Sequence, residues 1–120
     1  MKILAALLIS IVTMFGFEKL DSSNFNEKIE GKNVIIDFYA TWCPPCKILA
    51  QNLKDYDELK SQDNVTVFKV DVDEQMALAR KYNISKLPSV VYLKDGEVKD
   101  LQFGVLSADE LEALSQKHFK

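Results

Sequence analysis

Hydrophobic residues along this chain alternate between two spacings, which predict strands and helices in turn. Short apolar or alternating runs predict strands at residues 17–20, 34–40, 65–70, 89–93 and 97–103. Residues 34–40, VIIDFYA, are apolar almost throughout, which is typical of a central strand buried on both faces. Asp95-Gly96 separates the last two strands and is a strong hairpin-turn signal, so we expect these two strands to be antiparallel.

Helical spacing predicts one long helix and three shorter ones. The long helix is expected from Cys43 to about Lys60, with apolar positions at Ile48, Leu49, Leu53, Tyr56 and Leu59. The shorter helices are expected from a cap at Asp21, Ser22 or Ser23 to about Glu30, from a cap at Asp73 to about Tyr82, and from a Ser107–Glu110 capping box onward. The resulting order, β-α-β-α-β-α-β-β-α, predicts an α/β fold with a mixed five-stranded sheet and helices on both faces.

The N-terminus differs in composition from the rest of the chain. Met1-Lys2 precedes an apolar run at residues 3–17, which fits the positive and apolar regions of a signal peptide. The run is shorter than the roughly 20 residues that span a bilayer comfortably, and no clear cleavage site follows it. An uncleaved anchor and a first core helix are therefore alternatives.

The favoured interpretation divides the chain in two. We expect residues 1–16 to be a signal peptide or N-terminal anchor and residues 17–120 to form one domain. A positive segment before an exported domain indicates a periplasmic protein of the bacterial envelope, with a cytoplasmic location as the alternative. Membrane anchoring through the N-terminus is one form that the exported protein can take.

Composition and charge narrow the possible ligands. The chain is 48% hydrophobic and carries a net charge of -3, and no basic stripe indicates nucleic acid. A zinc site needs four ligands, whereas the chain offers two cysteines and one distant histidine, His118, which we expect to be solvated. No motif implies a metal, flavin or nucleotide, so we expect no cofactor.

The two cysteines, Cys43 and Cys46, lie in the segment WCPPCK at residues 42–47. A disulfide between them closes a ring too small to restrain much chain entropy, so a purely structural role is a weak interpretation. Cys43 is expected where a helix begins, and the positive helix N-terminus lowers a thiol pKa from about 8.5 toward about 7. The pair therefore predicts reversible exchange between dithiol and disulfide.

Several separated segments resemble thioredoxins. They are Asp37 in its strand, residues 40–43 (ATWC), Lys47, residues 69–73 (KVDVD), residues 87–89 (LPS), residues 94–98 (KDGEV) and Gly104. The resemblance covers about residues 17–119 and implies the thioredoxin fold and a protein-disulfide oxidoreductase. It also implies that Cys43 attacks the target disulfide and that Cys46, less exposed, resolves the mixed disulfide.

Two positions depart from the common thioredoxin pattern. The spacer between the cysteines is Pro44-Pro45 where Gly-Pro is usual; proline suits a first helical turn, and Pro44 should stiffen the loop. Gln51 stands where thioredoxins usually have a proline that kinks the long helix, so we expect a straighter helix here.

Asp37 interrupts a strand that is otherwise apolar. One interpretation is an edge or bulge position with the carboxylate in water. The other, favoured by the resemblance, is a buried proton acceptor beneath Cys46 whose pKa is raised by burial. Lys69 matches the lysine that lies near this carboxylate in the family, although an ordinary exposed strand lysine fits its position nearly as well.

The resemblance also assigns residues that contact substrate. Pro88 is expected to follow a cis peptide bond that faces the disulfide and exposes the Leu87 backbone to an extended substrate segment, with a plain trans proline as the alternative. Trp42 is expected to cover one side of the dithiol, and simple core packing is compatible with that role. Gly104 is expected to let a substrate backbone approach closely. Pro44 and Pro45, the two spacer prolines, are also expected to contact substrate.

Three functions fit these residues. The favoured one is a monomeric periplasmic reductant of protein disulfides, supplied with electrons by a membrane or soluble thiol donor; Asp37, Lys69 and the uncharged spacer favour reduction. An envelope oxidant that donates its disulfide is the second. A binding module that uses the thioredoxin fold only for docking is the third, and the intact dithiol argues against it.

Overall fold

The computed structural model describes residues 16–120, so the predicted signal peptide or anchor lies, apart from Gly16, outside the described residues. The strands are β1 (Glu18–Lys19), β2 (Asn33–Tyr39), β3 (Val65–Asp71), β4 (Ser89–Lys94) and β5 (Glu97–Phe103). The helices are α1 (Phe25–Ile29), α2 (Pro44–Leu59), α3 (Met76–Lys81) and α4 (Ala108–Phe119). Within the described part of the chain, no helix is both long enough and apolar enough to cross a bilayer.

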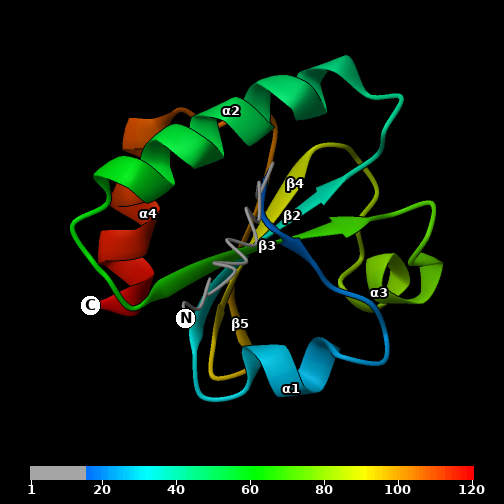
Figure 1. The fold of residues 1–120 in the computed structure, drawn as a ribbon, viewed down its shortest axis with the longest axis horizontal. Helices are drawn as coiled ribbons and strands as arrows, with labels where there is room; N and C mark the ends of the chain where they lie inside the picture. Colours follow the sequence, from blue (N-terminus) through cyan, green and yellow to red (C-terminus); the bar gives the residue numbers. More distant parts are fainter. Residues whose placement is uncertain (1–15) are drawn as a thin grey trace, which may run out of the picture.

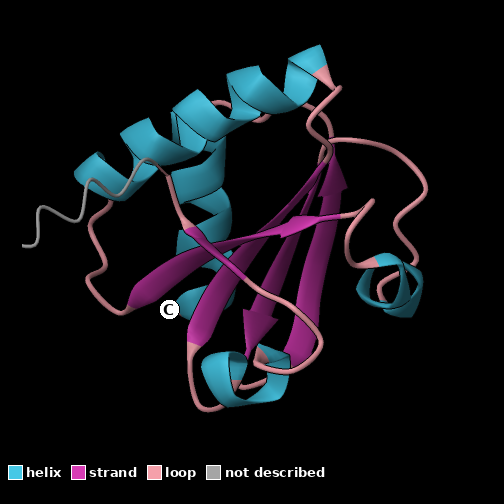
Figure 2. Cartoon of the chain, turned by 45° about the vertical axis from the view of Figure 1, so that its right-hand side comes forward, coloured by secondary structure: helices cyan, strands magenta, loops and turns pink. Residues whose placement is uncertain are grey.

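The strands form one mixed sheet in the order β1-β3-β2-β4-β5 (Figure 2). β1 and β2 run parallel to β3, β4 is antiparallel to β2, and β5 is antiparallel to β4. The predicted element order and mixed sheet are therefore confirmed. β2 is central, which explains its apolar sequence, and Asp37 pairs in register with Lys69 on one side and Val90 on the other.

Two helices cover each face of the sheet (Figure 1). One core contains Phe25 and Ile29 of α1 and Leu78 of α3, and the other contains α2 and α4 residues such as Leu53 and Leu111. Successive strand residues point to opposite faces, so β2 contributes alternately to the two cores. Its even positions 34, 36 and 38 join the α1–α3 core, whereas residue 35 joins the α2–α4 core. Asp37 follows the same alternation and lies under α2.

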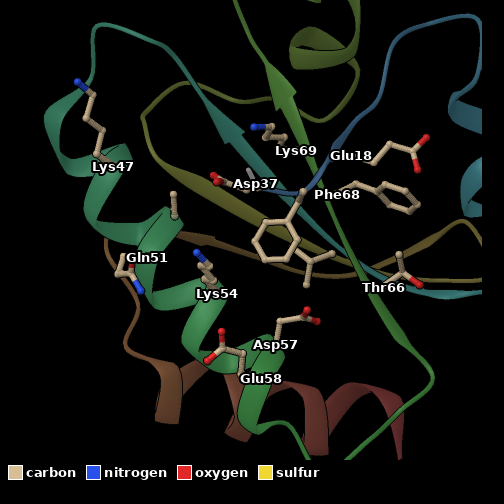
Figure 3. Close-up of a pocket in the computed structure, with 14 residues that line it drawn as sticks. Glu18, Asp37, Lys47, Gln51, Lys54, Asp57, Glu58, Thr66, Phe68 and Lys69 are labelled. Atoms are coloured by element: carbon tan, nitrogen blue, oxygen red, sulfur yellow. The ribbon is translucent and has the colours of Figure 1, made fainter. Parts of the chain in front are cut away.

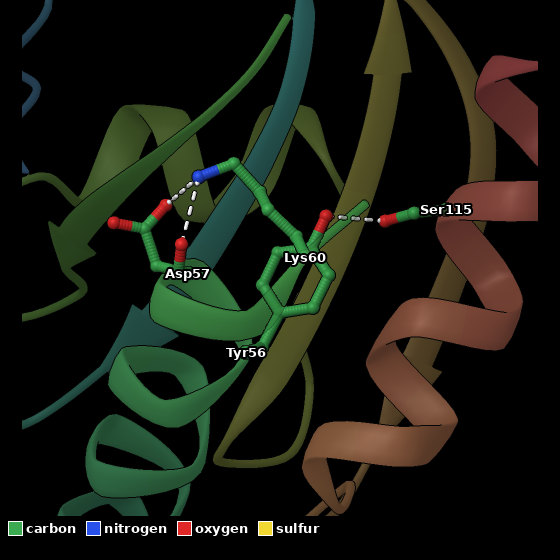
Figure 4. A network of polar contacts seen from close by, with 4 residues as sticks. All are labelled: Tyr56, Asp57, Lys60 and Ser115. Carbon is green, nitrogen blue, oxygen red and sulfur yellow. Dashed lines mark hydrogen bonds and ion pairs between the residues drawn. The ribbon is translucent and has the colours of Figure 1, made fainter. Parts of the chain in front are cut away.

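A buried hydrogen bond joins the two helices of that second layer. The hydroxyls of Tyr56 on α2 and Ser115 on α4 are 2.6 Å apart, with both residues almost fully buried (Figure 4). At the C-cap of α2, Lys60 pairs with the side chain of Asp57. The Tyr56–Ser115 hydrogen bond thus joins α2 to α4 near the C-terminal end of α2, whereas Cys43 and Cys46 lie at its N-terminal end.

The predicted caps are right for one of the three shorter helices. The Ser107–Glu110 capping box forms at α4, with both hydrogen bonds present. The first helix begins later than predicted: Asp21 accepts the N–H groups of Ser23 and Asn24 in a turn that precedes α1, and α1 itself starts at Phe25 with Asn24 as its N-cap residue. Asp73 likewise does not cap α3, which begins at Met76 without a side-chain cap.

Two of the apolar positions of α2, Ile48 and Leu59, lie off its buried stripe and are 58% and 79% exposed. His118 is not solvated: its Nε2 lies 2.8 Å from Asp100 Oδ2, and its ring packs against Tyr92. α2 runs without interruption through position 51, and its straightness stays a prediction.

Candidate active site

Cys43 lies at the junction between β2 and α2. It is the N-cap residue of α2, and Pro44 and Pro45 occupy the first two helical positions. Prolines fit there because the N–H groups of the first turn have no acceptor within the helix. They also remove two donors, so the first available helix amide belongs to Cys46. That amide donates to Cys43 Sγ at 3.3 Å.

The two cysteines form a disulfide, with their Cα atoms 5.3 Å apart. They pack with Ala40, and Tyr39 and Leu87 lie against this small cluster. In this oxidised form Cys43 and Cys46 are 4% and 3% exposed, so the predicted difference in exposure between them is absent.

Asp37 is buried beneath this pair, which excludes the edge or bulge interpretation. It is 3% exposed, and its Oδ1 has no hydrogen-bond partner among the described residues. Burial raises the pKa of Asp37 to about 7, and the positive charge of Lys69 opposes that shift only in part. A carboxyl whose pKa is raised to about 7 lies in the range that suits general acid–base chemistry at neutral pH.

Two cavities meet at Asp37. One, of about 280 Å³, is also lined by Cys46, Lys47 and Lys69. The other, of about 560 Å³, extends between α2 and β3, where Asp37 lies at the inner end and Lys54 reaches in from the helix (Figure 3). Cys46 and the buried carboxyl of Asp37 thus share one of these spaces.

Lys69 is half-buried, so it is not the ordinary exposed strand lysine that the sequence left as an alternative. Its strand neighbour across the ladder is Asp37, and its Nζ lies 5.7 Å from the centre of the Tyr39 ring. The Lys69 ammonium thus lies near the Asp37 carboxyl. No salt bridge between the two is present among the described residues.

Trp42 lies on the surface, so core packing does not describe it. The side chain is 68% exposed, and its Nε1 donates a 2.7 Å hydrogen bond to Asp73 Oδ2. With Cys43 and the two prolines it lines a cavity of about 500 Å³ beside the dithiol. Asp73 was predicted only as a helix cap, because it follows a strand, and its contact with Trp42 was not expected.

The other side of the disulfide is formed by the loop that enters β4. The Leu87–Pro88 peptide bond is cis, as the resemblance implied, and Leu87 lines the same 500 Å³ cavity. Gly104 donates its N–H to the Pro88 carbonyl at 2.9 Å. Its φ of +110° favours glycine, and a Cβ added there would meet nothing within 4 Å. Open space therefore adjoins the backbone at Gly104.

Comparison with known proteins places this site in a family. The sequence profile of thioredoxins matches residues 16–117. The chain belongs to the thioredoxin family. Thioredoxins are protein-disulfide oxidoreductases, and the spacing of Cys43 and Cys46 fits their CXXC active site. The Cys43–Cys46 disulfide of this structure is the oxidised form of such a site.

Relatives with curated sequences support the assignment. The chain is 45% identical to Thioredoxin-T of Drosophila melanogaster over 91 residues, which are 74% of this chain but 55% of that protein. It is 37% identical to Thioredoxin H3 of Arabidopsis thaliana over 84% of this chain and 80% of that one. It is 35% identical to thioredoxin of Bacillus subtilis over 83% of this chain and 95% of that one.

Solved structures agree with the fold. A thioredoxin mutant from Halobacterium salinarum superposes with a TM-score of 0.77 at 29% identity, covering 88% of this chain and 92% of that one. The thioredoxin of Malassezia sympodialis gives a TM-score of 0.77 at 32% identity with the same coverage. The predicted thioredoxin fold is confirmed.

Proposed function

We propose that this thioredoxin-family chain reduces disulfides in proteins, with Cys43 as nucleophile and Cys46 as resolving thiol. The observation that carries the proposal is the position of the Cys43 sulfur at the N-cap of α2, where the Cys46 amide donates to it. The same amide and the positive helix end would stabilise a thiolate at Cys43 after reduction.

The reaction has two exchange steps. The Cys43 thiolate attacks one sulfur of the substrate disulfide, forms a mixed disulfide and releases the first substrate thiolate, which takes a proton. Cys46 then loses its proton to Asp37 and attacks Cys43, so the Cys43–Cys46 bond forms and the second substrate thiolate leaves and takes up the proton held by Asp37. The substrate gains two electrons and two protons. A separate dithiol donor returns the chain to its reduced state.

We assign substrate contacts to the surface around the disulfide. Trp42, Pro44, Pro45 and Leu87 line the adjoining cavity, which supports this assignment. The Leu87 backbone would pair with an extended substrate segment, and the open space at Gly104 would admit that segment closely. Lys69 would tune Asp37 and not touch the substrate.

Reduction of a disulfide-bonded protein such as insulin tests the activity. We expect wild type to reduce insulin with dithiothreitol as electron source, Cys43→Ser to be inactive, and Cys46→Ser to trap mixed disulfides. Equal activity of wild type and Cys43→Ser would favour the binding module instead. Equilibration with glutathione tests the direction: a potential near about -270 mV supports a reductant, and one near about -120 mV an oxidant.

The location is a separate part of the proposal. We infer export from the positive and apolar residues that open the sequence, with the periplasm as the compartment and the monomer as the working form. Sequencing the N-terminus of protein recovered from cell fractions tests it. Recovery from the cytoplasm with Met1 present would overturn export and leave the exchange chemistry intact.

A further inference from the structure

The cavity beside the disulfide has one charged wall. Its volume is about 500 Å³, and apolar side chains such as Trp42, Ile84 and Leu87 form most of its surface. Among the described residues that line it, Lys86 alone carries a charge. A substrate segment seated next to Cys43 would therefore meet a single positive group.

Local contacts fix the place of Lys86. The buried hydroxyl of Ser89 donates to the Lys86 carbonyl at 2.6 Å and holds this part of the loop against the start of β4. Ser89 pairs in register with Phe103 of β5. The Lys86 Nζ lies 5.0 Å from the centre of the Phe103 ring, which is 56% exposed. The lysine thus extends from the cavity wall to an exposed aromatic ring.

Apart from its contact with the Phe103 ring, the charge of Lys86 has no ionic partner among the described residues. No carboxylate of the described residues lies within salt-bridge distance of it. Asp73, which does not line the cavity, accepts a hydrogen bond from Trp42 Nε1 at 2.7 Å. Among the described residues that line it, the cavity therefore presents one positive group, beside Leu87, and no carboxylate.

We propose that Lys86 selects disulfide substrates that carry an acidic side chain next to the attacked cysteine. This inference rests on the proposed exchange chemistry at Cys43 and names its substrate class. Complementary charge at the edge of a contact raises the association rate and fixes orientation more than it adds affinity. Lys86 therefore acts on the capture of substrate, before the first exchange step.

Two peptide substrates test the proposal. They share one intrapeptide disulfide and a fluorescent reporter, and differ only in Glu or Lys beside the attacked cysteine. Reduction is followed with dithiothreitol as electron source. We expect wild type to favour the Glu peptide in kcat/KM by about two- to fivefold, the range of an exposed ion pair. The preference should fade in about 1 M salt, where the Debye length is about 3 Å.

Three variants make the test specific. Lys86→Glu should reverse the preference, and Lys86→Met should abolish it while both proteins keep the wild-type melting temperature. Lys94→Glu makes the same change in charge at the far end of β4 and should keep the preference. Equal wild-type rates on both peptides, or a preference that survives in Lys86→Met, would overturn the inference. Failure of wild type to reduce either peptide would overturn the proposed function itself.

Discussion

Asp37 and Cys46 face the same cavity of about 280 Å³, one from the central strand β2 and the other from the first turn of α2. No described residue satisfies Oδ1 of the carboxyl. In the proposed mechanism Cys46 must lose a proton, and a neighbouring carboxyl whose pKa is raised to about 7 is suited to accept it.

Asp37→Asn should stabilise the oxidised protein above neutral pH. The pKa of Asp37 is raised from 3.8 to about 7, so the folded state holds a proton that the unfolded state has lost. Wild type therefore loses stability as the pH rises from about 4 through about 7. The increase in the free energy of unfolding of Asp37→Asn over wild type should be larger by about 2 kcal/mol at about pH 8 than at about pH 5. Urea unfolding at both pH values measures it, and a gain independent of pH would contradict the assignment.

The same variant should slow the second exchange step. Asp37 is the one carboxyl among the described residues that line the cavity of Cys46, and the loss of a general base typically costs about 100-fold or more in rate. Rapid-mixing measurements of release of the second substrate thiol at about pH 8 report this step directly. Below about pH 6 wild-type Asp37 is protonated, so the two rates should converge.

A matched variant separates this effect from a change in net charge. Asp55→Asn removes a carboxylate that binds Gln51 on the surface of α2. It should leave both steps at wild-type rates. If Asp55→Asn and Asp37→Asn slowed the second step equally, the proton-acceptor role of Asp37 would be lost.

The spacing of hydrophobic residues was enough to predict the fold, because each strand and helix here shows the spacing typical of its type. β2 is apolar on both faces because it is central, and the hairpin signal at Asp95-Gly96 gives the antiparallel β4–β5 pair. The caps of α1 and α3 were wrong for a local reason. An Asp after a strand can bond either a turn or a helix start, and at Asp21 the turn forms.

Contacts between polar side chains far apart in the sequence were the part of the structure that could not be predicted. The CXXC motif, Asp37 and Pro88 are visible in sequence because each breaks or completes a local pattern. The Trp42–Asp73 hydrogen bond joins two loops, and nothing in either loop signals the partner. The contact between His118 and Asp100 was missed for the same reason, since it appears only once α4 packs beside β5.

Asp73→Ala should weaken substrate capture more than it weakens the fold. It removes the acceptor of the Trp42 Nε1 hydrogen bond, which orients an indole that is 68% exposed. We expect KM for a protein disulfide to rise about threefold, while the free energy of unfolding falls by no more than about 1 kcal/mol, the usual worth of such a bond. Glu74→Ala, which removes a neighbouring exposed carboxylate, is the control. A similar rise in KM for both variants would refute the role of Trp42 orientation.

The Tyr56–Ser115 hydrogen bond should stabilise the α2–α4 layer that supports Cys46. Both hydroxyls are buried and lie 2.6 Å apart, so removing one leaves the other without its partner. Tyr56→Phe and Ser115→Ala should each lower the free energy of unfolding by about 1–3 kcal/mol, whereas the double variant should lose less than the sum. Urea unfolding of the four proteins gives the coupling energy. Strictly additive losses would mean that the two hydroxyls do not interact, and that the helices are held by their apolar contacts alone.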